Sequence, residues 1–180
     1  MEIKHASVKT AQRVNIKFMT ITAVFITLTY VFTAFVNIRL PLAANGGLIH
    51  LGNIPLFLGA IIFGKKTGAL AGGLGMGLFD ILSGWLIWAP FTIVIVGLMG
   101  FTIGKITEKR KGTGWYIAAI LVACGIKIVG YYIAECIIYG NWLAPISSIP
   151  GNVLQIVLAA VIVLPIVKRL DTLAVKSNLK

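Results

Sequence analysis

The feature that most constrains this sequence is a series of six apolar segments separated by short polar ones. The segments cover residues 16–36, 51–63, 68–82, 89–106, 115–139 and 151–167. Charged residues make up only 12% of the chain, about half their share in a typical soluble domain. One small core could not bury so much apolar surface. The sequence therefore predicts an all-α integral membrane protein with six transmembrane helices.

Other architectures fit the sequence less well. Cys124 and Cys136 share one apolar segment, and in a helix they would lie about 18 Å apart, too far for a disulfide. Strands with alternating polar and apolar residues are absent, which disfavours a membrane barrel. The first apolar run is long and no small-x-small cleavage site precedes a polar domain, so we expect an uncleaved helix rather than a signal peptide.

The positive charges predict the orientation of the helices. Those that would lie on one side are Lys4, Lys9, Arg13, Lys17, Lys65, Lys66, Lys105, Lys109, Arg110, Lys111, Lys168, Arg169, Lys176 and Lys180. Only Arg39 falls on the other side. The positive-inside rule then places both termini in the cytoplasm. We expect a single domain over 1–180, with basic cytoplasmic ends at 1–15 and 168–180. This topology accounts for most of the net charge of +11, so no nucleic-acid partner is needed.

The connections on the opposite, outer side contain the residues expected to shape a site. They cover residues 37–50, 83–88 and 140–150 and are rich in Pro, Gly, Trp and Asn. Irregular loops above helix ends commonly form binding sites. Trp85 and Trp88 supply aromatic surfaces there, although an interfacial aromatic belt would explain them equally well.

The fifth segment carries ionisable residues inside the membrane. Lys127, Tyr131 and Glu135 are four residues apart and share one flank of a helix. The two charged groups would be about 12 Å apart along the axis, so each needs another partner. Asn152 and Gln155, at the outer end of the sixth segment, lie at a matching depth. A binding pocket is the favoured interpretation, because intramembrane charges are costly; a buried network that pins helices together is the alternative.

Two further residues near the outer side have weaker assignments. Asp80 ends the third segment, where it either binds a ligand or orients a loop, and the second role is favoured. His50 opens the second segment, but the other histidine, His5, is expected on the opposite side. A metal site is therefore poorly supported, and we expect no cofactor.

The sequence has no energy-coupling or catalytic motif. The stretch Gly59 to Lys66 nearly matches a phosphate-binding loop, but Lys66 stands where Ser or Thr would bind magnesium, and Gly59 falls inside a predicted helix. The glycines of the third segment suit close helix packing in lipid. No catalytic triad, carboxylate pair or cysteine cluster is visible. The chain is therefore not expected to be an enzyme.

The central part of the chain carries a family resemblance. Its motifs are Leu51-Gly52-Asn53, Gly64-Lys65-Lys66-Thr67-Gly68, Gly72-Gly73-Leu74-Gly75-Met76-Gly77 and Trp88-Ala89-Pro90-Phe91-Thr92. This pattern resembles the substrate-binding S component of energy-coupling factor (ECF) vitamin transporters, in the branch assigned to hydroxymethylpyrimidine or pyridoxine uptake. The resemblance extends from the first segment to the sixth.

The resemblance implies a six-helix carrier in the bacterial plasma membrane that binds one vitamin from outside. Its partners would be a transmembrane coupling subunit and two ATPase subunits. The site residues that it implies are Trp85, Trp88, Glu135 and Asn152, then His50, Asp80, Tyr131, Gln155 and Lys127. The family's docking motif on the first helix is Ala-x-x-x-Ala, which is here Ala23-x-x-x-Thr27.

Three alternatives stay open at this stage. The ligand could be riboflavin or pantothenate, and a deep lysine would suit an anionic vitamin such as pantothenate. The chain could be a stand-alone ion-coupled transporter that uses Lys127 and Glu135 as a proton relay, although its halves show no repeat. A small membrane enzyme or scaffold is the least supported.

Overall fold

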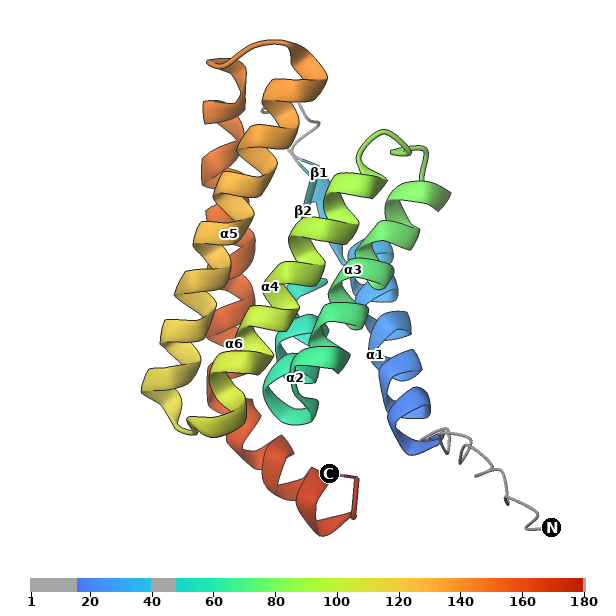
Figure 1. Cartoon of the computed structure of the whole chain (residues 1–180), viewed down its shortest axis with the longest axis vertical. Coiled ribbons are helices and arrows are strands. Elements are labelled where there is room, and N and C mark those ends of the chain that lie inside the picture. Colours follow the sequence, from blue (N-terminus) through green and yellow to red (C-terminus); the bar gives the residue numbers. More distant parts are fainter. Residues whose placement is uncertain (1–15, 40–47, 180) are drawn as a thin grey trace, which may run out of the picture.

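All six apolar segments are helical in the computed structural model, which describes residues 16–39 and 48–179 (Figure 1). The helices are α1 (Ile16–Phe35), α2 (Asn53–Phe63), α3 (Lys65–Leu82), α4 (Ala89–Lys109), α5 (Thr113–Tyr139) and α6 (Ile149–Lys176), and the short 3-10 helix η1 (Ala144–Ser148) leads into α6. The predicted basic segment 1–15, most of the 37–50 connection and Lys180 lie outside the described residues.

The structure differs from the sequence-based prediction in three places. First, α6 continues to Lys176, so most of the predicted basic tail is helical, and Pro165 inside it does not end the helix. Second, α3 begins at Lys65, because Gly64 makes the whole turn from α2 with a φ of 90°, a conformation that costs glycine little. Third, strands β1 (Asn37–Arg39) and β2 (Leu48–His50) pair antiparallel, although no strand was expected.

Four stretches within the described residues are long and apolar enough to cross a membrane. They are α1, α4, α5 and the continuous η1–α6 stretch. Helix α2 has 11 residues, and α3 is rich in glycine. Leu56, Phe57 and Ala60 of α2 are fully buried, and α2 packs against α1, α3, α4 and α6. This short helix therefore forms the core of the bundle.

Helices α3 and α4 pack closely along a line of glycines. A Cβ atom built on Gly68 would lie 2.6 Å from both the Ala60 Cβ and the Gly100 carbonyl oxygen. One built on Gly100 would collide with the Gly68 carbonyl oxygen. Small residues at such positions let helix backbones approach one another in lipid. The glycines of α3 therefore serve packing, as their spacing predicted.

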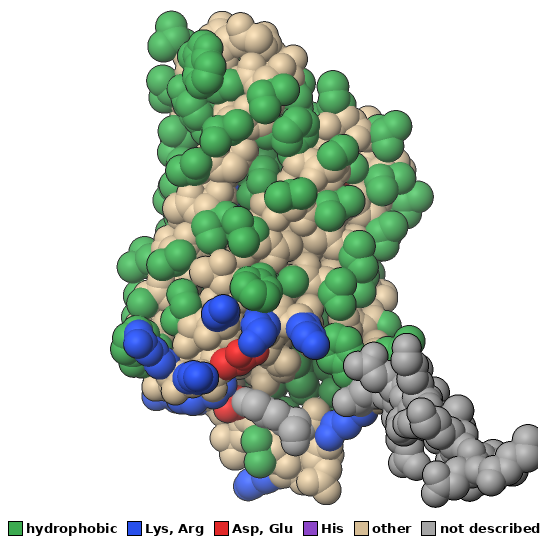
Figure 2. Space-filling view, viewed as in Figure 1, with side chains coloured by type: hydrophobic (Ala, Val, Ile, Leu, Met, Phe, Trp, Pro, Cys, Tyr) green, Lys and Arg blue, Asp and Glu red, His purple; other side chains and the backbone are tan. Residues whose placement is uncertain are grey.

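The two ends of the bundle differ in charge. Figure 2 shows Lys and Arg side chains gathered at the end that holds the α4–α5 turn and the last turns of α6, whereas apolar side chains cover the rest of this face. The α3–α4 and α5–η1 connections lie at the opposite end (Figure 1). Gly59 to Lys66 spans the end of α2, the Gly64 turn and the start of α3. Its first glycine therefore lies inside a helix, whereas a phosphate-binding loop directly follows a strand.

Candidate ligand-binding cavity

A cavity of about 470 Å³ opens near the end of the bundle away from the basic side chains. Its volume falls within the usual range for small-molecule sites. Its walls come from α1, β2, α3, α4, α5, η1 and α6. The predicted site residues that line it are His50, Asp80, Trp85, Trp88, Lys127, Tyr131, Asn152 and Gln155. Eight of the nine residues that the sequence analysis assigned to a site therefore meet at one cavity.

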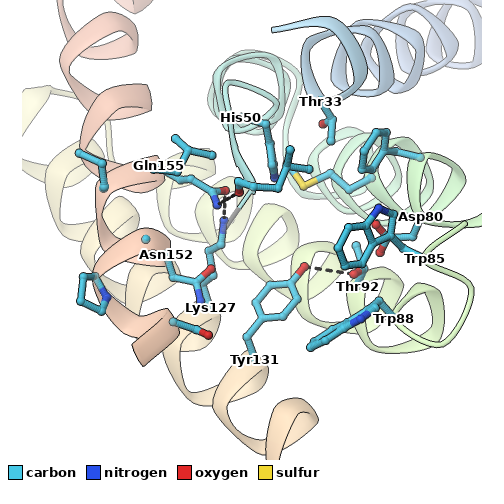
Figure 3. A pocket seen from close by; sticks show the side chains of 18 of the residues that line it. Thr33, His50, Asp80, Trp85, Trp88, Thr92, Lys127, Tyr131, Asn152 and Gln155 are labelled. Atoms are coloured by element: carbon cyan, nitrogen blue, oxygen red, sulfur yellow. Dashed lines mark hydrogen bonds between the residues drawn. The ribbon is translucent and has the colours of Figure 1, made fainter. Parts of the chain in front are cut away.

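Lys127 lies at the cavity wall and has a protein partner. Its side chain is only 2% exposed, and its Nζ donates a hydrogen bond of 2.7 Å to Gln155 Oε1 (Figure 3). Gln155 Nε2 in turn donates to the carbonyl oxygen of Leu48, at 2.9 Å. This chain of hydrogen bonds ties α5, α6 and β2 together, so one glutamine fixes both the lysine and the strand that carries His50.

Asp80 belongs to a second polar group on another wall. The hydroxyls of Thr92 and Tyr131 are 3.1 Å apart, and Thr92 also hydrogen-bonds the Asp80 carboxyl group. The second carboxyl oxygen, Asp80 Oδ2, is buried without a hydrogen-bond partner among the described residues. Buried polar atoms are rarely left unpaired. This oxygen is therefore a candidate acceptor for a ligand or an ordered water.

Aromatic rings form much of the wall beside Asp80. Trp88 is 8% exposed, and its ring lies 6.5 Å from that of Tyr131 and 6.0 Å from that of Tyr139. Trp85 lines the cavity from the α3–α4 connection. Figure 3 shows the rings of Trp85 and Trp88 on the side of Asp80, and the ring of Tyr131 between them and Lys127. Such rings provide flat, apolar surfaces with few rotatable bonds.

His50 presents an uncharged imidazole to the cavity. Its Nδ1 accepts a hydrogen bond of 3.3 Å from the Gly52 backbone N–H, so Nε2 carries the proton. Burial, and then the nearby Lys127 charge, lower the pKa of His50 to about 3. His50 therefore offers a hydrogen-bond donor and no charge at neutral pH.

Glu135 is the predicted site residue that does not line the cavity. It is fully buried, and its Oε2 accepts a hydrogen bond of 2.8 Å from Ser148 Oγ. Ser148 itself lines the cavity. Glu135 thus holds η1 against α5 from behind the wall, while Asn152, one turn into α6, lines the cavity directly.

Several lining residues were not identified from the sequence. They include Thr33, Met76, Phe79, Thr92 and Ser148. Thr92 was part of the Trp-Ala-Pro-x-Thr motif, which could have singled it out. Thr33 gave no such signal, because it is one of several threonines in an apolar segment and only the packing of α1 brings it to the cavity.

The predicted docking positions lie on α1. Ala23 and Thr27 are both exposed, and Thr27 Oγ1 donates a hydrogen bond of 3.0 Å to the Ala23 carbonyl oxygen. This bond keeps the hydroxyl against its own helix, so the exposed face around these residues is nearly apolar.

Comparison with known proteins identifies relatives over most of the chain. Residues 13–172 match the family described as ECF-type riboflavin transporter, S component. The thiamine precursor transporter HmpT of Lactococcus lactis subsp. cremoris (strain MG1363) is 27% identical over 148 residues, which cover 82% of this chain and 84% of that protein. The biotin transporter BioY of Thermotoga maritima is 28% identical over 111 residues, or 48% of this chain and 66% of that protein.

The family match covers nearly the whole bundle, from before α1 to the last turns of α6. The similarity to HmpT supports the branch to which the sequence motifs pointed. These relatives are transporters, and the chain has apolar helices able to cross a membrane, so it is an integral membrane protein of a transport system rather than an enzyme. The chain belongs to the S-component family of ECF-type transporters, which confirms the resemblance seen in its motifs.

Proposed function

We propose that this chain is the substrate-capture subunit of an ATP-driven ECF importer in the bacterial plasma membrane. It binds a small heterocyclic vitamin or vitamin precursor from the outer face, and hydroxymethylpyrimidine or pyridoxine is the expected ligand. The observation that carries this proposal is the cavity, which combines polar groups and aromatic rings near one end of the bundle. Vitamin heterocycles offer both ring faces and hydrogen-bonding edges.

The proposed topology has six crossings with both termini in the cytoplasm. The clustering of Lys and Arg at one end of the bundle supports this orientation, because it leaves the cavity near the outer face. Helices α2 and α3 are shorter or less apolar than ordinary spans. Their burial against other helices lets them cross without meeting lipid on all sides.

ATP hydrolysis is assigned to partner subunits. We propose that the exposed α1 face around Ala23 and Thr27 contacts the transmembrane coupling subunit, which joins two ATPase subunits. Ala23→Leu and Thr27→Leu should then reduce uptake by the assembled importer while ligand binding by the isolated chain stays unchanged. A loss of binding in these variants would contradict the assignment.

Calorimetry with the purified chain tests the proposed function. The panel is hydroxymethylpyrimidine, pyridoxine, riboflavin, pantothenate and biotin, the last because BioY is a relative. We expect tight 1:1 binding of one compound. Asn152→Trp, which fills the cavity, should abolish it, whereas the matched change Leu121→Trp, at a site 65% exposed on α5, should not. If the wild-type chain binds none of the five, the proposal is wrong.

A stand-alone ion-coupled transporter remains the second candidate, because Lys127 and Glu135 are both buried. Their hydrogen-bond partners differ, since Lys127 donates to Gln155 and Glu135 accepts from Ser148. This arrangement favours two structural contacts over one proton relay. Uptake by the chain alone in ATP-free proteoliposomes would support the second candidate, whereas uptake only with the ATPase partners would support the first.

A further inference from the structure

Asp80 differs from the other acidic residue near the cavity in what its oxygens contact. Glu135 is fully buried behind the wall and accepts a hydrogen bond from Ser148. Asp80 lines the cavity, and its Oδ2 is buried with no hydrogen-bond partner among the described residues. A buried carboxylate oxygen without a donor is unfavourable. A ligand in the cavity can supply the donor that this oxygen lacks among the described residues.

The polar groups of the cavity are divided between two sides. Figure 3 shows Lys127 and Gln155 on one side and Asp80, near Trp85, on the other. Lys127 is a hydrogen-bond donor only, whereas the unpaired Asp80 oxygen can accept. A ligand that satisfies both sides needs a donor on one edge and an acceptor on the opposite edge.

The surfaces beside Asp80 suit a flat ring. Trp85 and Trp88 line the cavity close to it, and Tyr131 lies between the two polar sides (Figure 3). The Tyr131 hydroxyl is held by Thr92, which also contacts Asp80. The carboxylate therefore has a fixed position relative to the aromatic wall. A group that recognises one edge of a ligand ring by hydrogen bonding needs such a fixed position.

We propose that Asp80 is the specificity-determining carboxylate of the cavity. Its Oδ2 accepts a hydrogen bond from an N–H group on one edge of a planar nitrogen heterocycle, while an acceptor or hydroxyl on the opposite edge faces Lys127. This inference rests on the proposed function and narrows its ligand class to amino-substituted nitrogen heteroaromatics. It assigns Glu135 to the wall rather than to ligand recognition.

The test compares two probes that differ at one edge. The first is 4-amino-5-hydroxymethyl-2-methylpyrimidine, and the second is its 5-hydroxymethyl-2,4-dimethylpyrimidine analogue, in which a methyl group of similar size replaces the amino donor. The wild-type chain should prefer the amino compound by about ten- to hundredfold, the range expected for one hydrogen bond to a charged group. This measurement needs no variant, so it stands even if a substituted chain fails to fold.

Asp80→Asn should reduce that preference to within about threefold, because the amide keeps the shape but loses the charge. Glu108→Gln makes the same carboxylate-to-amide change at the basic end, where Glu108 pairs with Lys65, and it should leave the preference intact. A folded Asp80→Asn chain with the wild-type preference would overturn the assignment. So would a wild-type chain that binds both probes equally.

The two proposals fail in different ways. If the wild-type chain binds neither pyrimidine but binds another vitamin in the panel, the specificity role proposed for Asp80 is wrong, whereas the proposed function of the chain stands. If it binds no vitamin at all, both are wrong.

Discussion

Helices α3 and α4 are held together in a different way from α5 and α6. The first pair packs backbone against backbone at Gly68 and Gly100. The second pair is linked by side-chain hydrogen bonds, from Lys127 to Gln155 and from Ser148 before α6 to Glu135. Close backbone packing cannot adjust to added volume, whereas polar side-chain contacts can be exchanged. The comparison indicates one helix pair held by the shape of its backbones and one held by specific side-chain hydrogen bonds.

The largest effect should come from breaking the backbone contact between α3 and α4. Gly100→Ala places a methyl group against the Gly68 carbonyl oxygen, which can move only if the helices separate. We expect a loss of about 3 kcal/mol or more in stability, measured by thermal unfolding in detergent. Gly125→Ala on α5 is the control, since a Cβ there meets nothing within 4 Å. Equal losses of stability in the two variants would show that close backbone packing between α3 and α4 is not what makes Gly100 sensitive.

The next largest effect should come from the polar link between α5 and α6. Gln155→Leu leaves the buried Lys127 ammonium without its acceptor and should cost about 2–3 kcal/mol. Adding Lys127→Met removes the unpaired charge and should restore part of that loss. Unfolding of the ligand-free single and double variants measures the coupling. A double variant less stable than Gln155→Leu would show that the two side chains act independently.

A smaller effect should distinguish a residue on the cavity surface from one behind it. Asn152→Ala should weaken ligand binding by about 1–2 kcal/mol, because Asn152 lines the cavity. Glu135→Gln keeps an acceptor for Ser148 and should change affinity by less than about 0.5 kcal/mol. Calorimetry with the compound that binds in the vitamin panel gives both values. A larger loss in Glu135→Gln would return Glu135 to the binding site, where the sequence analysis placed it.

The smallest effect should come from the basic end of the bundle. Lys65 Nζ lies 2.8 Å from Glu108 Oε2, but both side chains are about one-third exposed. Lys65→Met should therefore change stability by less than about 0.5 kcal/mol. The change should shrink further in high salt, since exposed ion pairs are screened. Unfolding at low and high ionic strength checks both points, and a large salt-independent loss would contradict this prediction.

The sequence predicted the helical segments well because their signals are local. Apolar runs end where charges, Gly or Pro begin, and α1, α4 and α5 begin or end within a few residues of the predicted positions. The ends of α3 and α6 were less predictable. Lys65 and Lys66 were predicted to lie in a loop, but Gly64 alone makes the turn and both lysines belong to α3. The charged residues after residue 167 looked like a tail, yet they continue α6 as a helix.

The sequence predicted which residues lie near the candidate site, but it did not predict how they contact one another or which of them face the cavity. Lys127 was expected to need a partner, and Gln155 was among those at a matching depth; the structure pairs them. The roles of Asp80 and Glu135 in the structure differ from those that the sequence predicted. The sequence analysis favoured Glu135 for the ligand and a loop-orienting role for Asp80, whereas the structure places Asp80 on the cavity and Glu135 behind it.

The amino-acid sequence by itself determined the membrane class, the family and the basic end, because these depend on segment length, motif and charge order along the chain. Only the tertiary structure decided which carboxylate faces the cavity and which polar groups pair. Successive residues of a helix point in directions about 100° apart, and the rotation of each helix is set by the packing of its neighbours. Glycine contacts between α3 and α4 and the buried α2 fix that rotation here.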